Sequence, residues 1–159
     1  MAHAESVRGR VLGLDPGERW IGVAVSDDDR RLALPLLTID RRAEEDDGAL
    51  AIAERLDAES ATLVVVGVPL NKEGEEDAQA RSFRRLGERL AAALGLPAVV
   101  VSERFTNPLP PPAPPPQRRR RGRTTVAQHQ KRRVEEHALA AANILQRWLD
   151  QEASASRRG

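Results

Sequence analysis

Apolar residues along the chain form short unbroken runs and longer runs with helical spacing. Residues 11–14 and 21–26 are two short runs of valine, leucine, isoleucine and small residues, and the turn sequence between them predicts a hairpin. Residues 63–69 read LVVVGVP, a continuous apolar run that is typical of a central strand covered on both faces. Residues 32–38 and 96–103 are two further predicted strands.

Helical spacing predicts helices over residues 43–60, 78–95 and 124–153, the second of them closed by a glycine C-cap. The apolar positions that define them are Leu50, Ala53 and Leu56, then Phe83, Leu86, Leu90 and Leu94, then Val134, Leu139, Ile144, Leu145 and Trp148. A strand, a helix and a strand follow one another over residues 63–103, which implies a parallel pair joined by a crossover. We therefore predict an α/β fold with a mixed sheet.

One segment breaks the pattern. Residues 107–123 contain seven of the eleven prolines within nine residues and then a run of arginines, so polyproline II conformation is expected there. A chain of 159 residues suits one domain with one core. We predict a single domain over residues 1–159 with a proline-rich and arginine-rich insert at about 107–123.

Charge and composition narrow the functional classes. The formal net charge is only +1, yet residues 117–133 hold eight basic residues and no acidic one, a pattern that favours contact with a phosphate polymer over a merely solvated loop. The absence of cysteine excludes disulfides and thiolate metal sites and favours the cytoplasm. Neither a secretory signal nor a run of roughly 18 apolar residues is present, so no membrane partner is expected.

Two carboxylates stand at the ends of predicted strands, Asp15 before a Pro-Gly turn and Glu103 before Arg104. If their strands are close neighbours, both side chains converge at one rim of the sheet, where open α/β sheets bind ligands. Such oxygen clusters hold magnesium or manganese ions, which can activate phosphodiester hydrolysis. The alternative is ordinary turn chemistry for Asp15 and an ordinary surface residue for Glu103.

Four collinear blocks resemble one known family. The blocks LGLDPGERWIGVAVSD, VVVGVPLNKEGEEDAQARSFRRLGERL, LGLPAVVVSERFT and AAANILQRWLD are similar to the YqgF (RuvX) family of Holliday-junction-resolvase-like nucleases. The resemblance implies a ribonuclease H-like fold, a five-stranded mixed sheet with helices on both faces. It also implies maturation of the precursor of small-subunit (16S) ribosomal RNA, with resolvase-like activity on DNA junctions as an older proposal, and catalysis with divalent cations held by acidic residues.

Carried over by position, the family's first two acidic residues fall on Asp15 and Glu103, and the third falls on His137, where the family usually has aspartate. The resemblance thus implies that Asp15, Glu103 and His137 are catalytic and metal-binding. A histidine ligand favours Mn²⁺ over Mg²⁺. Two alternatives stay open for this position: a surface histidine, and Glu136 as a substitute ligand.

The chain departs from the family after its fifth predicted strand. Ser102 replaces an aspartate, and the proline-rich stretch replaces a helix-forming part, while the basic residues persist. Those assigned to nucleic-acid binding are Arg104, Arg118, Arg119, Arg120, Arg121 and Arg123. With two phenylalanines, two tryptophans and no tyrosine, recognition is expected to use backbone and shape more than base stacking.

The sequence therefore predicts a cytoplasmic nuclease that uses Mg²⁺ or Mn²⁺ to cleave structured nucleic acid, with RNA favoured over branched DNA. Two alternatives of other classes stay open: a nucleic-acid-binding protein without catalysis, and an ATP-binding module of the actin and Hsp70 kind. Both a monomer and a homodimer are compatible with this prediction.

Overall fold

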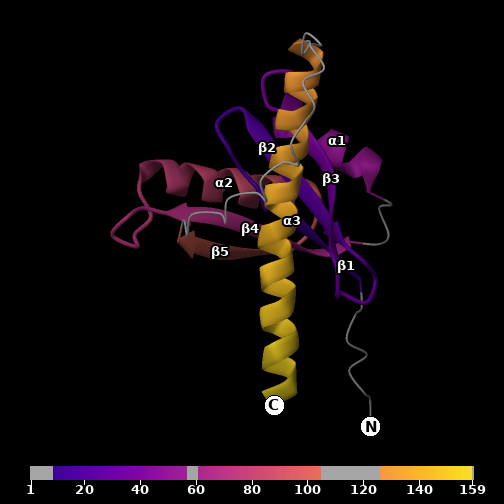
Figure 1. Ribbon diagram of the computed structural model, residues 1–159, viewed down its shortest axis with the longest axis vertical. Coiled ribbons are helices and arrows are strands. Elements are labelled where there is room, and N and C mark those ends of the chain that lie inside the picture. The colour runs from indigo at the N-terminus through magenta and orange to yellow at the C-terminus, as the bar shows by residue number, and fades with distance from the viewer. Residues whose placement is uncertain (1–8, 57–60, 105–125, 159) are drawn as a thin grey trace, which may run out of the picture.

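The computed structural model describes residues 9–56, 61–104 and 126–158, without the side chains of residues 45, 103, 104 and 126–134. Five strands form one sheet that lies between two layers of helices (Figure 1). The strands are β1 (Arg10–Asp15), β2 (Trp20–Ser26), β3 (Ala33–Asp40), β4 (Ala61–Leu70) and β5 (Ala98–Arg104). The helices are the 3₁₀ turn η1 (Glu45–Gly48), α1 (Ala49–Arg55), α2 (Ala78–Ala93) and α3 (Val126–Arg158).

The strand order is β3-β2-β1-β4-β5. β2 runs antiparallel to β1 and to β3, whereas β4 runs parallel to β1 and to β5. The predicted hairpin, the parallel pair and the mixed sheet are therefore confirmed. Because β1, β4 and β5 point the same way, their carboxyl ends lie at one edge of the sheet, which we call the carboxyl edge.

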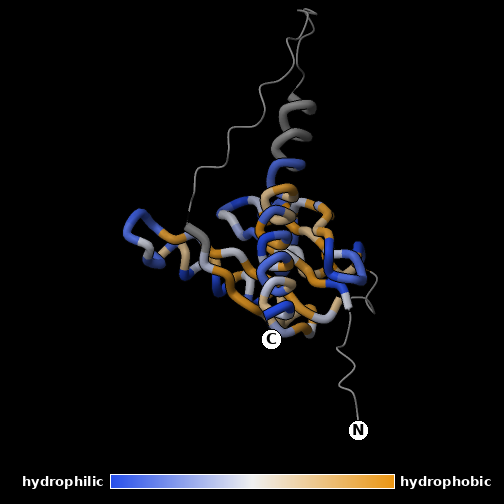
Figure 2. Tube along the Cα trace, turned by 60° about the horizontal axis from the view of Figure 1, so that its bottom comes forward, coloured by the Kyte–Doolittle hydropathy of each residue, from blue (hydrophilic) through white to orange (hydrophobic). Residues whose placement is uncertain are grey.

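One face of the sheet packs large aliphatic side chains against α2 and α1. Leu14 of β1 and Val66 of β4 belong to this core, together with Leu86 and Leu90 of α2. The predicted apolar face of α2 is confirmed, since Phe83, Leu86 and Leu90 are buried. Each such leucine contributes roughly 2 kcal/mol to the free energy of folding by leaving water. Figure 2 shows that the strands are mainly hydrophobic and that the loop between β4 and α2, at the left, is mainly hydrophilic.

The other face packs against α3 through small residues. A Cβ at Gly13 would lie 2.9 Å from Cβ of Leu145, one at Gly22 would lie 1.9 Å from the carbonyl oxygen of His137, and one at Gly67 would lie 2.7 Å from Cδ1 of Ile144. On the helix side, the buried residues are Ala138, Ala141, Ala142, Leu145 and Leu149. The three glycines thus allow the backbone of α3 to lie directly on the sheet.

Three predicted core positions, Leu50, Ala53 and Leu139, are wrong because they are exposed. Leu50 is 68% exposed and Leu139 is 53% exposed. α1 begins only at Ala49, after the left-handed residues Asp46, Asp47 and Gly48, so Ala49 and Ile52 face the core instead of Leu50. In α3 the alanines, Leu145 and Leu149 face the glycine-lined sheet, whereas Leu139 lies outside that packed side of the helix. Residues 57–60, the insert at 107–123 and the side chain of Val134 lie outside the described part.

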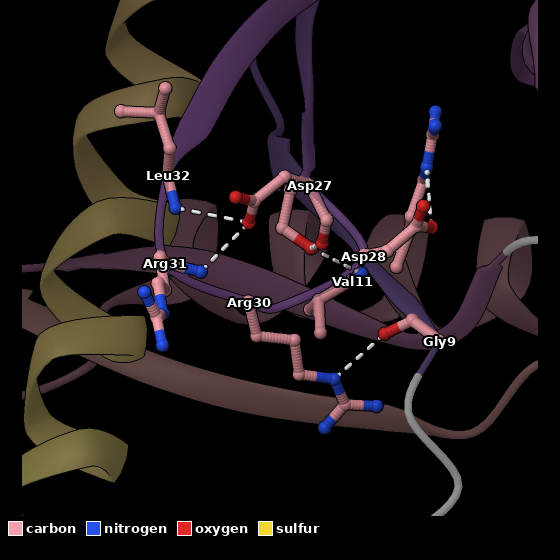
Figure 3. Close-up of polar contacts among 9 residues, drawn as sticks. Gly9, Val11, Asp27, Asp28, Arg30, Arg31 and Leu32 are labelled. Atoms are coloured by element: carbon pink, nitrogen blue, oxygen red, sulfur yellow. Dashed lines mark hydrogen bonds and ion pairs between the residues drawn. The ribbon is translucent and has the colours of Figure 1, made fainter.

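The opposite edge of the sheet is closed by the turn between β2 and β3 (Figure 3). The Asp27 carboxylate accepts hydrogen bonds from the backbone N–H groups of Arg31 at 2.8 Å and Leu32 at 3.2 Å, and these bonds hold the pKa of Asp27 below its ordinary value. Arg30, with φ of 57°, donates from Nε to the carbonyl oxygen of Gly9 at 2.7 Å. These contacts fix the end of the sheet that is remote from the carboxyl edge.

None of the helices in the described ranges is both long enough and apolar enough to span a bilayer.

Candidate active site

Asp15 is the last residue of β1 and is half-buried at the carboxyl edge. It pairs with Gly22 of β2 on the face that α3 covers. The turn that follows is tight, because a Cβ at Gly17 would lie 2.6 Å from the carbonyl oxygen of Trp20. Arg41 holds this turn by donating to the carbonyl oxygens of Gly17 at 3.0 Å and Glu18 at 3.1 Å. The backbone that carries Asp15 is therefore fixed on both sides.

Glu103 lies near the end of β5, two strands away from Asp15. Leu14 pairs with Val66, so Asp15 is level with Gly67, and Gly67 pairs in turn with Val101. Glu103 is two residues beyond Val101, at a position of the same parity in the pleat. Strands β1 and β5 are roughly 10 Å apart, since neighbouring strands are about 4.8 Å apart. The positions of Asp15 and Glu103 thus share one edge and one face of the sheet, with β4 between them.

His137 lies on α3, above the strand that pairs with β1. Its backbone carbonyl is the group that a side chain at Gly22 would strike, and Gly22 is the direct partner of Asp15. Its imidazole stacks with the indole of Trp20, with ring centroids 6.2 Å apart and ring planes at 25°. Glu136, the proposed substitute ligand, is exposed on the same helix. α3 therefore brings its predicted site residue to the carboxyl edge.

The donor groups suit a hard divalent cation in part. Carboxylate oxygens, as on Asp15 and Glu103, are the ligands that Mg²⁺ and Mn²⁺ prefer, and the imidazole of His137 is compatible with Mn²⁺. Among the side chains that the structure describes, no three carboxylate, imidazole or thiol groups lie close enough together to hold an ion. The side chain of Glu103 lies outside the described part, so the pair Asp15 and Glu103 and the choice between His137 and Glu136 stay predictions.

The predicted phosphate-binding residues are only partly located. Arg104 is the last residue of β5 and pairs with Leu70 of β4, but its side chain lies outside the described part of the structure. Arg118, Arg119, Arg120, Arg121 and Arg123 all lie outside the described ranges.

Sequence reasoning missed an ion pair beside the edge. Arg84 of α2 binds the Glu76 carboxylate, which also accepts a hydrogen bond from Ser102 Oγ at 3.4 Å. The Arg84 guanidinium lowers the pKa of Glu76 below its ordinary value. Glu76 lies in the loop before α2 and Arg84 lies eight residues later in the helix. Such a spacing does not predict a contact, so only the three-dimensional structure reveals the pair. It neutralises one carboxylate near Glu103 and ties the β4–α2 loop to β5.

The loop between β4 and α2 is shaped by Asn71. Its side-chain oxygen accepts hydrogen bonds from the N–H groups of Glu73 at 3.1 Å and Glu75 at 2.9 Å, and Gly74 takes a φ of 78°. This asparagine and this glycine therefore build the loop itself. Gly22, similarly, allows the backbone of α3 to approach β2 closely.

Comparison with known proteins decides the family. A family model described as "RuvX: Holliday junction resolvase" matches residues 9–151. The chain belongs to the RuvX family. A protein of Anaeromyxobacter dehalogenans named "Putative pre-16S rRNA nuclease" is 42% identical over 144 residues, covering 91% of this chain and 98% of that protein. A protein of the same name from Chloroflexus aggregans is 46% identical over 98 residues, covering 61% of this chain and 68% of that protein.

Among solved structures, the chain is similar to the protein in "T. thermophilus RuvC in complex with Holliday junction substrate". The sequence identity is 17% and the TM-score is 0.41, over 59% of this chain and 64% of that one. The five-stranded mixed sheet with helices on both faces, which the resemblance to the RuvX family predicted, is confirmed. The RuvX chain is accordingly a nuclease, an enzyme that acts on nucleic acid.

Proposed function

We propose that this RuvX protein is a cytoplasmic, divalent-metal-dependent nuclease that hydrolyses phosphodiester bonds in structured RNA, with the precursor of 16S ribosomal RNA as its substrate. The single observation that supports it most is the convergence of Asp15, the position of Glu103 and the helix turn of His137 on the carboxyl edge. The names of the relatives support the RNA substrate, and the family description supports branched DNA as a second one.

In this proposal Asp15 and Glu103 hold the cation, and His137 or Glu136 provides the third ligand. The bound cation would supply charge neutralisation at the scissile phosphate and lower the barrier to attack by water. Asp15 contributes a carboxylate from a backbone that the Arg41 contacts keep rigid, so little reorganisation is needed when substrate binds. Mn²⁺ is the preferred ion if His137 binds it.

The basic residues have a separate task. Arg104 follows Glu103 directly and is assigned to the phosphate next to the scissile bond, where a guanidinium can bind two oxygens. The arginines of residues 118–123 are assigned to more distant phosphates of the substrate, so they should contribute to affinity and to its salt dependence. Both a monomer and a homodimer are compatible with these assignments.

The experiment is a cleavage assay with end-labelled RNA duplex, single-stranded RNA and a four-way DNA junction, each with Mg²⁺ or Mn²⁺. Wild-type protein is compared with Asp15→Asn and with a matched control, Asp28→Asn. Asp28 is a carboxylate with a 77% exposed side chain that pairs with Arg10 at the opposite edge of the sheet.

Cleavage by the wild type and by Asp28→Asn but not by Asp15→Asn is the expected result. Equal cleavage by wild type and Asp15→Asn would contradict the site. Salt-sensitive retention of RNA without any metal-dependent product would contradict the nuclease assignment and support a binding protein. Nucleotide-dependent stabilisation without cleavage would support an ATP-binding module instead.

A further inference from the structure

Trp20 joins α3 to the strand beside Asp15. It is the first residue of β2 and lies two residues before Gly22, the partner of Asp15. Since β2 is antiparallel to β1, the start of β2 lies at the carboxyl edge. The indole stacks with the imidazole of His137. This aromatic contact therefore lies at the rim of the candidate site.

The indole of Trp20 also contacts an arginine that precedes it in the chain. The guanidinium carbon of Arg19 lies 4.6 Å from the ring centroid of Trp20, within the range of a cation–π interaction. Arg19 in turn makes a two-point contact with Asp40 at the end of β3, with Nε to Oδ1 at 3.4 Å and Nη2 to Oδ2 at 3.2 Å. The Arg19 guanidinium holds the pKa of the Asp40 carboxyl below its ordinary value, so this pair stays ionised at neutral pH.

The backbone and the side chain of His137 are fixed by different contacts. Close packing on Gly22 fixes the helix backbone at His137, but it leaves the two side-chain torsions of the histidine free. The stack with Trp20 selects one orientation of the ring. A ring that is oriented before substrate arrives avoids the entropy cost of ordering it during the reaction.

We propose that Trp20 is a positioning residue that fixes the imidazole of His137 at the rim of the site, and that Arg19 and Asp40 fix Trp20. The inference rests on the proposed function insofar as His137 takes part in cleavage. It goes beyond that function by assigning a role to three residues that the carboxylate and histidine set does not include.

The kinetic test compares Trp20→Ala with Trp148→Ala in the full chain. Trp148 is the matched control, because it is the other tryptophan, is also partly buried, and packs in the same interface between α3 and the sheet. Trp20→Ala should lower kcat about tenfold with KM within a factor of two, whereas Trp148→Ala should leave kcat within a factor of two. Trp20→Phe, which keeps an aromatic ring, should restore kcat to within about threefold of the wild type.

A double variant separates positioning from loss of folding. If Trp20 acts through His137, then Trp20→Ala should lower kcat no further in a His137→Ala background. Losses that multiply in the double variant, or a kcat for Trp20→Ala that matches the wild type, would overturn the proposal.

A spectroscopic measurement tests the pair without any cleavage. In a Trp148→Phe background Trp20 is the only tryptophan, so acrylamide quenching of fluorescence reports the accessibility of its ring alone. Removal of the imidazole by His137→Ala should raise the quenching constant about twofold, because one neighbour of the ring is lost. Leu139→Ala, which truncates an exposed side chain of the same helix, should leave the constant unchanged. An unchanged constant in His137→Ala would overturn the proposal, and absence of cleavage by the wild type would overturn only the proposed function.

Discussion

The two faces of the sheet are built on different principles. Toward α2, leucine, isoleucine and valine side chains fill the space between helix and sheet, as in an ordinary core. Toward α3, glycines in β1, β2 and β4 leave almost no space, and the helix contributes alanines together with Leu145 and Leu149. The face toward α2 stabilises the fold by burying a large apolar surface, whereas the face toward α3 allows a helix backbone to approach the strands closely.

That difference places the chemistry on one face. Asp15 and the position of Glu103 belong to the face that α3 covers, and close contact at Gly22 brings His137 to the same edge. The carboxylate near the edge on the α2 side, Glu76, is instead paired with Arg84. We infer that the α3 face forms the site and that the α2 face supports it.

The largest effect is expected for Asp15→Asn. Loss of the charge should lower kcat about a thousandfold, which corresponds to about 4 kcal/mol of transition-state stabilisation. The urea midpoint should change little, because the amide keeps the shape of the side chain. If circular dichroism shows that Asp15→Asn is unfolded, and the loss of activity is explained by that unfolding alone, Asp15 does not belong to the catalytic set.

Gly22→Ala should damage stability and activity together. The new Cβ would lie 1.9 Å from the backbone carbonyl oxygen of His137, so α3 must move away from the sheet. We expect a loss of about 3 kcal/mol in the free energy of unfolding and about a hundredfold loss in kcat, since the helix carries a site residue. Urea unfolding and saturating kinetics measure the two quantities.

Gly95→Ala is the control for this glycine. A Cβ there meets nothing within 4 Å, and φ is 71°, so only backbone strain of about 1 kcal/mol is expected, without a change in kcat. If Gly22→Ala behaves like Gly95→Ala, close contact between α3 and β2 is not what positions His137.

Gly87→Ala makes the same substitution on the opposite face. Its Cβ would lie 2.3 Å from Cγ1 of Val66, a side chain in the core under α2. Stability should fall by about 2 kcal/mol, because the core must repack, but kcat of the folded protein should stay within a factor of two of the wild type. A loss of kcat as large as that of Gly22→Ala would show that the two faces do not divide their tasks.

The smallest effect concerns Glu76 and is a dependence on pH. The pKa of this carboxyl is lowered from 4.5 by Arg84, so the pair stabilises the fold above the ordinary value and loses this contribution as pH falls through the lowered one. Glu76→Gln lacks this titration. The difference in urea midpoint between wild type and Glu76→Gln should be present at pH 7 and should shrink as the pH falls below 4.5 and through the lowered pKa. A difference that stays constant over this range would exclude the ion pair as its cause.

The sequence predicts the strands and α2 well because their signals are local. A short unbroken apolar run such as residues 63–69 is typical of a central strand, and one apolar stripe marks the buried side of α2. The location of Asp15 at the carboxyl edge follows from the same signals, because parallel strands end at a common edge.

The packing of α3 could not be predicted in the same way. Leu139 carries a strong apolar signal yet is exposed, because the buried side of the helix is set by glycines that lie far away in the sequence. The stack of Trp20 with His137 and the pair of Arg84 with Glu76 likewise depend on the tertiary arrangement. Local spacing identifies which segments form elements, but not which small residues allow them to touch.

The most direct test of the account is the binding of Mn²⁺, followed by electron paramagnetic resonance as the loss of the free-ion signal. Wild-type protein and Asp28→Asn should bind Mn²⁺ with the same affinity, whereas Asp15→Asn and Glu103→Gln should each weaken binding at least about tenfold, since each removes a carboxylate ligand. Equal affinity for Mn²⁺ in all four proteins would contradict a shared metal site at the carboxyl edge.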